Sequence, residues 1–136
     1  MSQGADQPGS TGDVLLYEAA EGRLRLEVRL QDETLWLTQN QLAELFQTTQ
    51  QNISGHIQNV YAEGELEREA THKKFLSVQR EGSREVSRQR DFYNLDMIIA
   101  VGYRVKSAIA TRFRIWATER LKEYIGASAP DVIARV

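Results

Sequence analysis

A group of amide and hydroxyl side chains near residue 50 has the chemistry needed to read base pairs. The group consists of Thr49, Gln50, Gln51, Asn52, Ser54 and His56. Glutamine and asparagine can bond adenine in the major groove, and a serine hydroxyl can bond a base or a phosphate. On the exposed face of a helix, these residues would contact double-stranded DNA.

A second group of side chains could bind phosphate. Residues 72–122 carry a charge balance of +7, whereas residues 1–71 carry −8. Phosphate binding depends on the local field, so the net charge of −2 does not exclude nucleic acid. The basic candidates are Lys73, Lys74, Arg80, Arg84 and Arg88. An alternative is that the acidic and basic halves face one another across a dimer interface.

Other kinds of chemistry have little support. The chain has no cysteine, which removes disulfides and thiolate metal sites. His56 and His72 fall in different predicted elements, which favours solvated or core-edge histidines over a metal pair. Asp91 and Asp96 flank a predicted helix start and are better explained as capping or surface groups. The sequence contains no nucleophile–base arrangement and no glycine loop for phosphate, so we expect no enzyme activity, metal or cofactor.

The composition of the chain predicts one domain between two tails. Residues 1–12 are rich in glycine, serine, glutamine and aspartate, and we expect them to be disordered. Residues 13–126 are long enough to bury one core, and we expect residues 127–136 to form a loose tail. No apolar run is long enough to span a membrane and the start lacks a secretion signal, so we expect a cytoplasmic protein.

A β-meander is expected before the candidate recognition residues. Alternate positions from 24 to 30 are leucine or valine and the others are charged, which is the pattern of a half-buried strand. Short strands are expected at 14–17 and 34–37, with turns at 21–22 and 31–33. Trp36 is expected to fill the junction between the last strand and the following helix.

Two helices are expected next. Thr38 and Gln41 form a capping box for the first helix, whose apolar face contains Leu42, Ala43, Leu45 and Phe46. The second helix begins after Thr48 or Thr49 and runs to about Ala62, with Gly64 as its left-handed cap. This pattern is typical of a helix-turn-helix. Many structural helix pairs share it, so that alternative stays open.

The remaining chain predicts a hairpin and two helices. Strands at 73–79 and 84–93 are joined by a turn at 81–83, and a basic hairpin in this place would be a wing, although solvated faces of an ordinary hairpin also fit. Asn94 caps a helix over 95–101 that Gly102 stops. A last helix over 107–125 has apolar positions at Phe113, Trp116, Ala117, Leu121 and Tyr124. The expected fold is therefore α+β and winged-helix-like.

Several segments together resemble the virulence protein RhuM family. They are LEVRL at 26–30, TLWLTQ at 34–39, QLAELF at 41–46, IS at 53–54, HI at 56–57, EGEL at 63–66, YNLD at 93–96, VGYRVKS at 101–107, FRIWAT at 113–118 and LKEYI at 121–125. The resemblance covers residues 14–126. The FRIW segment is also similar, more distantly, to Bro-type phage antirepressor domains. The resemblance implies a bacterial, DNA-binding protein, often encoded on mobile genetic elements and associated with virulence.

Two departures from the family pattern affect that implication. Family members commonly carry arginine or lysine between Ser54 and His56, where this chain has Gly55. Glycine in a helix costs about 0.5–1 kcal/mol relative to alanine, and it removes a base or phosphate contact, which leaves readout to the neighbouring amides. Relatives also extend beyond residue 125, so an activity carried by a C-terminal domain would be missing from these 136 residues.

The sequence therefore supports two functions from different classes. The first is a DNA-binding transcription regulator, expected to act as a homodimer on two half-sites. The second is a protein-interaction module, either antirepressor-like or a toxin partner, which the acidic residues 63–69 favour. Continuity between the exposed face of residues 49–58 and the basic hairpin would favour DNA, and separation would favour a protein partner.

Overall fold

The computed structural model describes residues 13–105 and 107–125. Their elements are β1 (Asp13–Ala19), β2 (Leu24–Gln31), β3 (Thr34–Thr38), α1 (Gln39–Phe46), α2 (Gln50–Ala62), α3 (Arg68–Thr71), β4 (His72–Glu81), β5 (Arg84–Asn94), α4 (Leu95–Arg104) and α5 (Ala108–Ile125). The predicted α+β class is confirmed. The tails expected at 1–12 and 127–136 lie outside the described residues.

The strands form one antiparallel five-stranded sheet in the order β1-β2-β3-β5-β4. The predicted alternation in β2 is confirmed, because Leu26, Val28 and Leu30 are buried on the helix-covered face. Asp32 and Glu33 both have positive φ in the two-residue turn between β2 and β3, a turn geometry that suits the twist of a hairpin.

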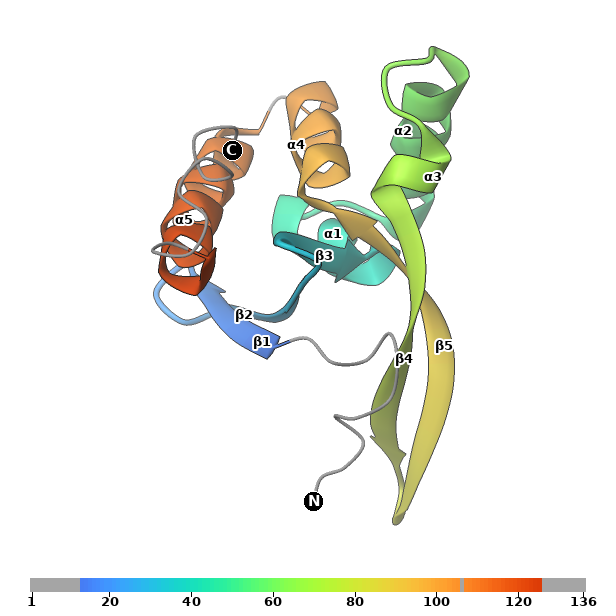
Figure 1. Cartoon of the computed structure of the whole chain (residues 1–136), viewed down its shortest axis with the longest axis vertical. Coiled ribbons are helices and arrows are strands. Elements are labelled where there is room, and N and C mark those ends of the chain that lie inside the picture. The colour runs from blue at the N-terminus through green and yellow to red at the C-terminus, as the bar shows by residue number, and fades with distance from the viewer. Residues whose placement is uncertain (1–12, 106, 126–136) are drawn as a thin grey trace.

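The helices cover one face of the sheet. Figure 1 shows α4 between α2 and α5, and α4 contacts both of these helices. The ring of Tyr17 on β1 packs edge-on against Phe113 and Trp116 of α5, with centroids 5.0 Å apart in each pair. This core extends from the first strand to the last helix, so these elements share one hydrophobic core.

The opposite face of the sheet has a small aromatic core of its own. Trp36, Phe75 and Phe92 form a separate buried cluster, and the Nε1 atom of Trp36 donates a hydrogen bond to the carbonyl of Gln31 at 2.8 Å. The prediction that Trp36 fills the strand–helix junction was wrong. Side chains alternate along a strand, and this places Trp36 on the sheet face opposite the helices, together with Phe75 of β4 and Phe92 of β5.

Two expectations for the last helices were also wrong. Gly102 lies inside α4, which continues to Arg104, because a glycine is needed there for close packing: a Cβ at Gly102 would collide with the Cβ of Ala110 and crowd the ring of Phe46. Tyr124 is 46% exposed. The apolar stripe of α5 therefore ends at Leu121, one turn before the predicted position.

Candidate nucleic-acid interface

A three-residue turn fixes the angle between α1 and α2. The predicted capping box at Thr38 is present, and Gln47 adopts the left-handed conformation with φ 57° and ψ 50°. A glycine often occupies such a position, so Gln47 carries a small conformational cost. The side chain of Thr49 then caps α2 by accepting a hydrogen bond from the backbone of Asn52.

Helix α2 is anchored by three buried side chains and presents polar side chains elsewhere. Ile53, Ile57 and Val60 are each at most 3% exposed, as expected from their spacing. Among the predicted site residues on this helix, Ser54 and His56 are half-buried. The other predicted site residues are exposed: the N-cap residue Thr49, and Gln50, Gln51 and Asn52 in the first turn of α2.

The α2 segment has no formal charge. Residues 45–62 contain no aspartate, glutamate, lysine or arginine. The amide of Asn52 donates to the hydroxyl of Thr48 at 2.9 Å, and the amide of Gln39 on α1 donates to the backbone carbonyl of Gln50 at 3.2 Å. These bonds tie the beginning of α2, which carries Gln50 and Gln51, to α1 and to the turn.

The β4–β5 hairpin contains the other predicted contact residues. Its two strands pair from His72 opposite Tyr93 to Glu81 opposite Arg84, and Gly82 in the turn has φ 65°. The hairpin joins the sheet through the pairing of β5 with β3, and the aromatic cluster packs both of its strands against Trp36 of β3. It is also attached by Arg29, whose guanidinium lies 4.7 Å from the ring centre of Phe75 and donates to the carbonyl of Leu76 at 2.9 Å.

Arg29 is a residue that the sequence analysis did not single out. Its guanidinium also lies 5.2 Å from the ring centre of Phe92 and donates to Gln31 at 3.0 Å. Burial lowers the pKa of this guanidinium from its ordinary value, although an arginine stays charged at neutral pH. Its position among the alternating outer residues of β2 was visible in the sequence, but its aromatic partners on the hairpin were not.

Most of the predicted basic side chains on the hairpin face an acidic partner. Lys73 lies 2.7 Å from Asp32, and Arg88 lies 3.0 Å from Glu81. The nitrogen–oxygen distances are longer in two other pairs, at 3.6 Å for Lys74 with Asp91 and 3.8 Å for Arg80 with Glu85. These pairs reduce the positive field below what a count of lysines and arginines suggests.

The recognition candidates and the end of the hairpin lie far apart. Figure 1 shows α2 near one end of the long axis and the β4–β5 turn at the other. Lys73 and Lys74 lie at the hairpin end next to α3, whereas Arg80 and Arg84 flank the distant turn. The surface of residues 49–58 is therefore not continuous with Arg80 and Arg84.

His72 and Asp91 form a polar pair where the hairpin begins. The Nε2 atom of His72 lies 2.7 Å from the Oδ1 atom of Asp91. The imidazole also contacts the ring of Tyr93 in a tilted arrangement. The hydrogen bond from His72, with a further contribution from Lys74, holds the pKa of Asp91 below its ordinary value. His56 lies on α2, a different element, and the described residues contain no cluster that could hold a metal.

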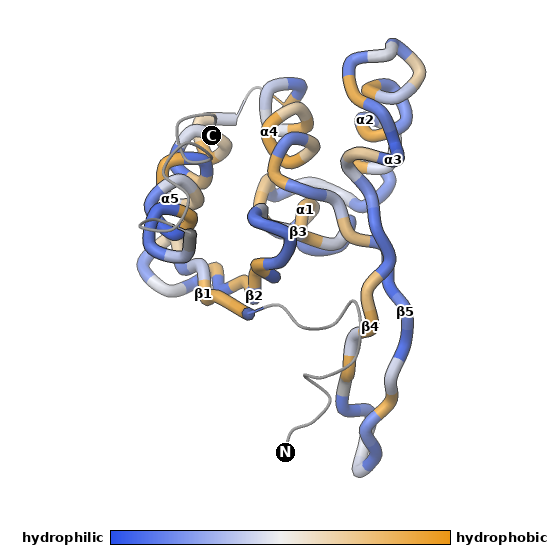
Figure 2. The backbone as a smooth tube through the Cα atoms, viewed as in Figure 1, coloured by the Kyte–Doolittle hydropathy of each residue, from blue (hydrophilic) through white to orange (hydrophobic). Residues whose placement is uncertain are grey.

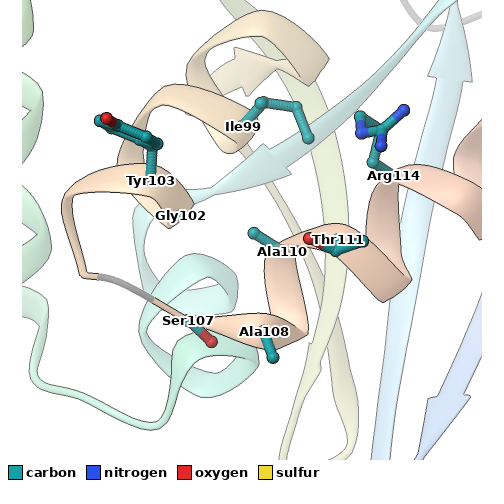
Figure 3. Close-up of a pocket in the computed structure, with 8 residues that line it drawn as sticks. All are labelled: Ile99, Gly102, Tyr103, Ser107, Ala108, Ala110, Thr111 and Arg114. Atoms are coloured by element: carbon teal, nitrogen blue, oxygen red, sulfur yellow. The ribbon is translucent and has the colours of Figure 1, made fainter.

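A cavity of about 500 Å³ between α4 and α5 is a second candidate site. Its lining consists of Ile99, Gly102, Tyr103, Ser107, Ala108, Ala110, Thr111 and Arg114 (Figure 3). Tyr103 is 84% exposed, and Arg114 is also exposed. An apolar floor beside an exposed tyrosine and arginine is a common arrangement at protein interfaces. Local sequence patterns did not reveal this cavity because it depends on how two helices cross.

The sequence model of the virulence protein RhuM family matches residues 70–128. Residues 70–128 are therefore similar to that family. The resemblance predicted from the motifs is thereby confirmed over a range that starts in α3 and includes the hairpin, α4 and α5. The RhuM match does not reach α1 or α2. Neither a curated protein nor a solved structure matches the chain. Among the described helices, none is long and apolar enough to cross a membrane.

Proposed function

We propose that the protein is a DNA-binding regulator in which α1 and α2 form a helix-turn-helix and α2 enters the major groove. The observation that carries the proposal is the uncharged, polar beginning of α2, held by the left-handed turn at Gln47 and the cap at Thr49. An amide on such a helix can bond adenine with two hydrogen bonds. We assign the base contacts to Gln50, Gln51 and Ser54, with no chemical reaction and no cofactor.

The hairpin would supply phosphate contacts in this proposal. Its ion pairs are exposed, and exposed pairs contribute only about 0–1 kcal/mol, so a phosphate can replace the acidic partner. The lysines next to α3 are better placed than the distant arginines to meet the same duplex as α2. The proposed binding should weaken steeply with salt, because each phosphate contact releases counterions.

The test is selection of binding sites from genomic DNA at moderate salt. Wild-type protein should enrich a palindromic motif, because a homodimer would place one α2 on each half-site. The variant with Gln50, Gln51 and Ser54 changed to alanine should lose the motif. A control changes Asn59, which is exposed on the later part of α2, and should keep it. A motif retained by the first variant would contradict the proposal.

The salt slope locates the phosphate contacts. Changing Lys73 and Lys74 to alanine should lower the slope of log affinity against log salt by about 0.9 for each lost contact. Changing Arg80 and Arg84 is the matched control, because it removes the same charge at the far end of the hairpin. Equal slopes for all three proteins would exclude the hairpin from binding.

Protein interaction is the second candidate, and it is favoured by the cavity between α4 and α5 and by the separation of α2 from the hairpin turn. In that case Tyr103 and Arg114 would contact a partner protein. Changing Tyr103 to alanine should then abolish partner capture while leaving DNA selection unchanged. If no DNA motif is enriched by wild-type protein, this candidate becomes the leading one.

A further inference from the structure

The two edges of the sheet differ in how they are protected. Edge strands present unpaired backbone groups to other chains, and lysines or covering contacts usually prevent unwanted pairing. The edge strand β4 contains Lys73, Lys74 and Arg80, and the carbonyl of Leu76 already accepts the bond from Arg29. The other edge strand, β1, contains no lysine or arginine.

Strand β1 also exposes two apolar side chains, beside Glu18, on the face that the helices leave uncovered. Val14 is 61% exposed and Leu16 is 47% exposed, and both lie opposite β2 residues of the outer sheet face. Within the described residues β1 has a strand on one side only, and Figure 1 shows it at the margin of the sheet. A seven-residue strand with exposed apolar side chains and no protecting cation is suited to pair with another strand.

We propose that β1 pairs antiparallel with β1 of a second copy of this chain, which joins the two sheets across a twofold axis at Leu16. Leu16 is the middle residue of Asp13–Ala19, so only this register pairs all seven residues. It places Asp13 opposite Ala19 of the partner subunit and Glu18 opposite Val14 of the partner subunit. No carboxylate then faces another carboxylate, whereas an in-register parallel pair would place equal charges side by side.

The proposed interface also sets the spacing of DNA half-sites, a consequence that rests on the proposed function. Figure 1 shows α2 on the side of the domain away from β1, so two α2 helices would lie at the outer ends of the dimer. A domain of about 100 residues has a radius of gyration of about 13 Å, which places the helices on the order of 60 Å apart. The half-sites should be about two helical turns apart, because one turn spans about 34 Å.

A single cysteine provides the first test, because the chain has none of its own. Directly opposed residues of an antiparallel pair have Cα atoms about 4.5–5.5 Å apart, a distance that a disulfide can bridge. Under mild oxidation, Leu16→Cys in the full chain should form a covalent dimer. Val78→Cys is the matched control, because Val78 is an exposed apolar residue on the other edge strand, and it should stay monomeric.

Sedimentation without DNA provides the second test. Wild-type protein should dimerise with a dissociation constant on the order of micromolar, as expected for a small interface. Leu16→Lys should raise that constant about tenfold or more by placing two cations together at the axis, whereas Val78→Lys should not. Mixing Leu16→Lys with Leu16→Glu should restore a dimer. Thermal melting would confirm that each variant is folded.

Three outcomes would overturn the strand pairing. They are a wild-type protein that is monomeric at its highest soluble concentration, equal cross-linking of the two cysteine variants, and equal weakening by the two lysine variants. Because these measurements contain no DNA, their failure leaves the proposed function standing. A failed DNA selection equally leaves the strand pairing standing.

Discussion

The beginning of α2 and the β4–β5 hairpin are built in opposite ways. The exposed part of α2 has amides and hydroxyls without formal charge, and its buried side joins the main core through Ile53, Ile57 and Val60. The hairpin has many charges, most of which face one another, and Figure 2 shows that much of its length is hydrophilic. Among the described residues its packed side chains lie toward β3, with Phe75 and Phe92 in the aromatic cluster and Tyr93 in the main core.

This contrast separates specificity from affinity. A rigid, uncharged helix face can discriminate bases because its hydrogen bonds depend on exact partners, whereas exposed charges attract any phosphate backbone. The ion pairs on the hairpin also moderate that attraction. Changes to α2 should therefore alter sequence selectivity, whereas changes to the hairpin should alter the salt-dependent part of the affinity.

Loss of Trp36 from the aromatic cluster should have the largest effect on the free energy of unfolding. Trp36 is 1% exposed, and Trp36→Ala should lower the free energy of unfolding by about 3–5 kcal/mol. Urea denaturation measures this loss. At a temperature where the variant is still folded, the DNA motif should persist while the salt slope falls, because the hairpin loses its support and α2 does not.

Val78→Ala is the matched control for Trp36→Ala, because Val78 lies on the same hairpin but is 59% exposed. It should change the free energy of unfolding by no more than about 0.5 kcal/mol. The contrast would be broken if Trp36→Ala abolished the motif itself. That result would mean that α2 depends on the hairpin for its position.

Loss of the α2 cap should have an intermediate effect on the other region. Thr49→Ala removes the acceptor for the backbone of Asn52 and should cost about 1 kcal/mol. Because the beginning of α2 would fray, DNA affinity should fall while the salt slope is unchanged. Thr49→Ser keeps a capping hydroxyl and should behave like wild type. An equal loss in both variants would assign the effect to the methyl group of Thr49 rather than to capping.

The elements of the α2 region were predictable because their signals are local. The caps at Thr38, Thr49 and Asn94 lie within three residues of the backbone groups that they bond, and the buried positions of α2 follow helical spacing. The period-two pattern of β2 likewise identified a strand with one buried face. A local rule suffices where partners are close in sequence.

The predictions that were wrong depend on partners distant in sequence. The aromatic partners of Trp36, at positions 75 and 92, lie on later strands, and Gly102 is explained by Phe46 and Ala110 rather than by a helix end. The charge count over residues 72–122 suggested a basic wing. It could not reveal that Lys73 bonds Asp32 of an earlier turn, since that pairing requires the completed sheet.

Substitution of Gly55 in α2 should change stability without changing DNA selectivity. A Cβ at this position meets no atom within 4 Å, so Gly55→Ala should raise the free energy of unfolding by about 0.5–1 kcal/mol through helix propensity alone. Urea denaturation measures the gain. The selected DNA motif should not change, because a methyl group adds no hydrogen bond.

Gly55→Arg extends this prediction to binding. It should steepen the salt slope by about 0.9, corresponding to one added phosphate contact, and so give α2 the electrostatic character that now belongs to the hairpin. Gln58→Arg is the control later on the same helix. If the two arginines steepened the slope equally, the beginning of α2 would have no privileged position toward DNA.

The smallest expected effect is the loss, in acid, of the stability that the His72–Asp91 pair contributes to the hairpin. Because the folded-state pKa of Asp91 is lowered, the pair stabilises the hairpin fully above the unfolded pKa of about 3.9, and that contribution is lost as the pH falls through the folded pKa. In urea denaturation, the stability difference between wild type and Asp91→Asn should therefore be larger at about pH 5 than at about pH 3. The α2 region has no carboxylate between residues 45 and 62, so the capping loss in Thr49→Ala should be the same at both pH values. A difference for Asp91→Asn that did not shrink in acid would show that the hydrogen bond stabilises the hairpin without the charge.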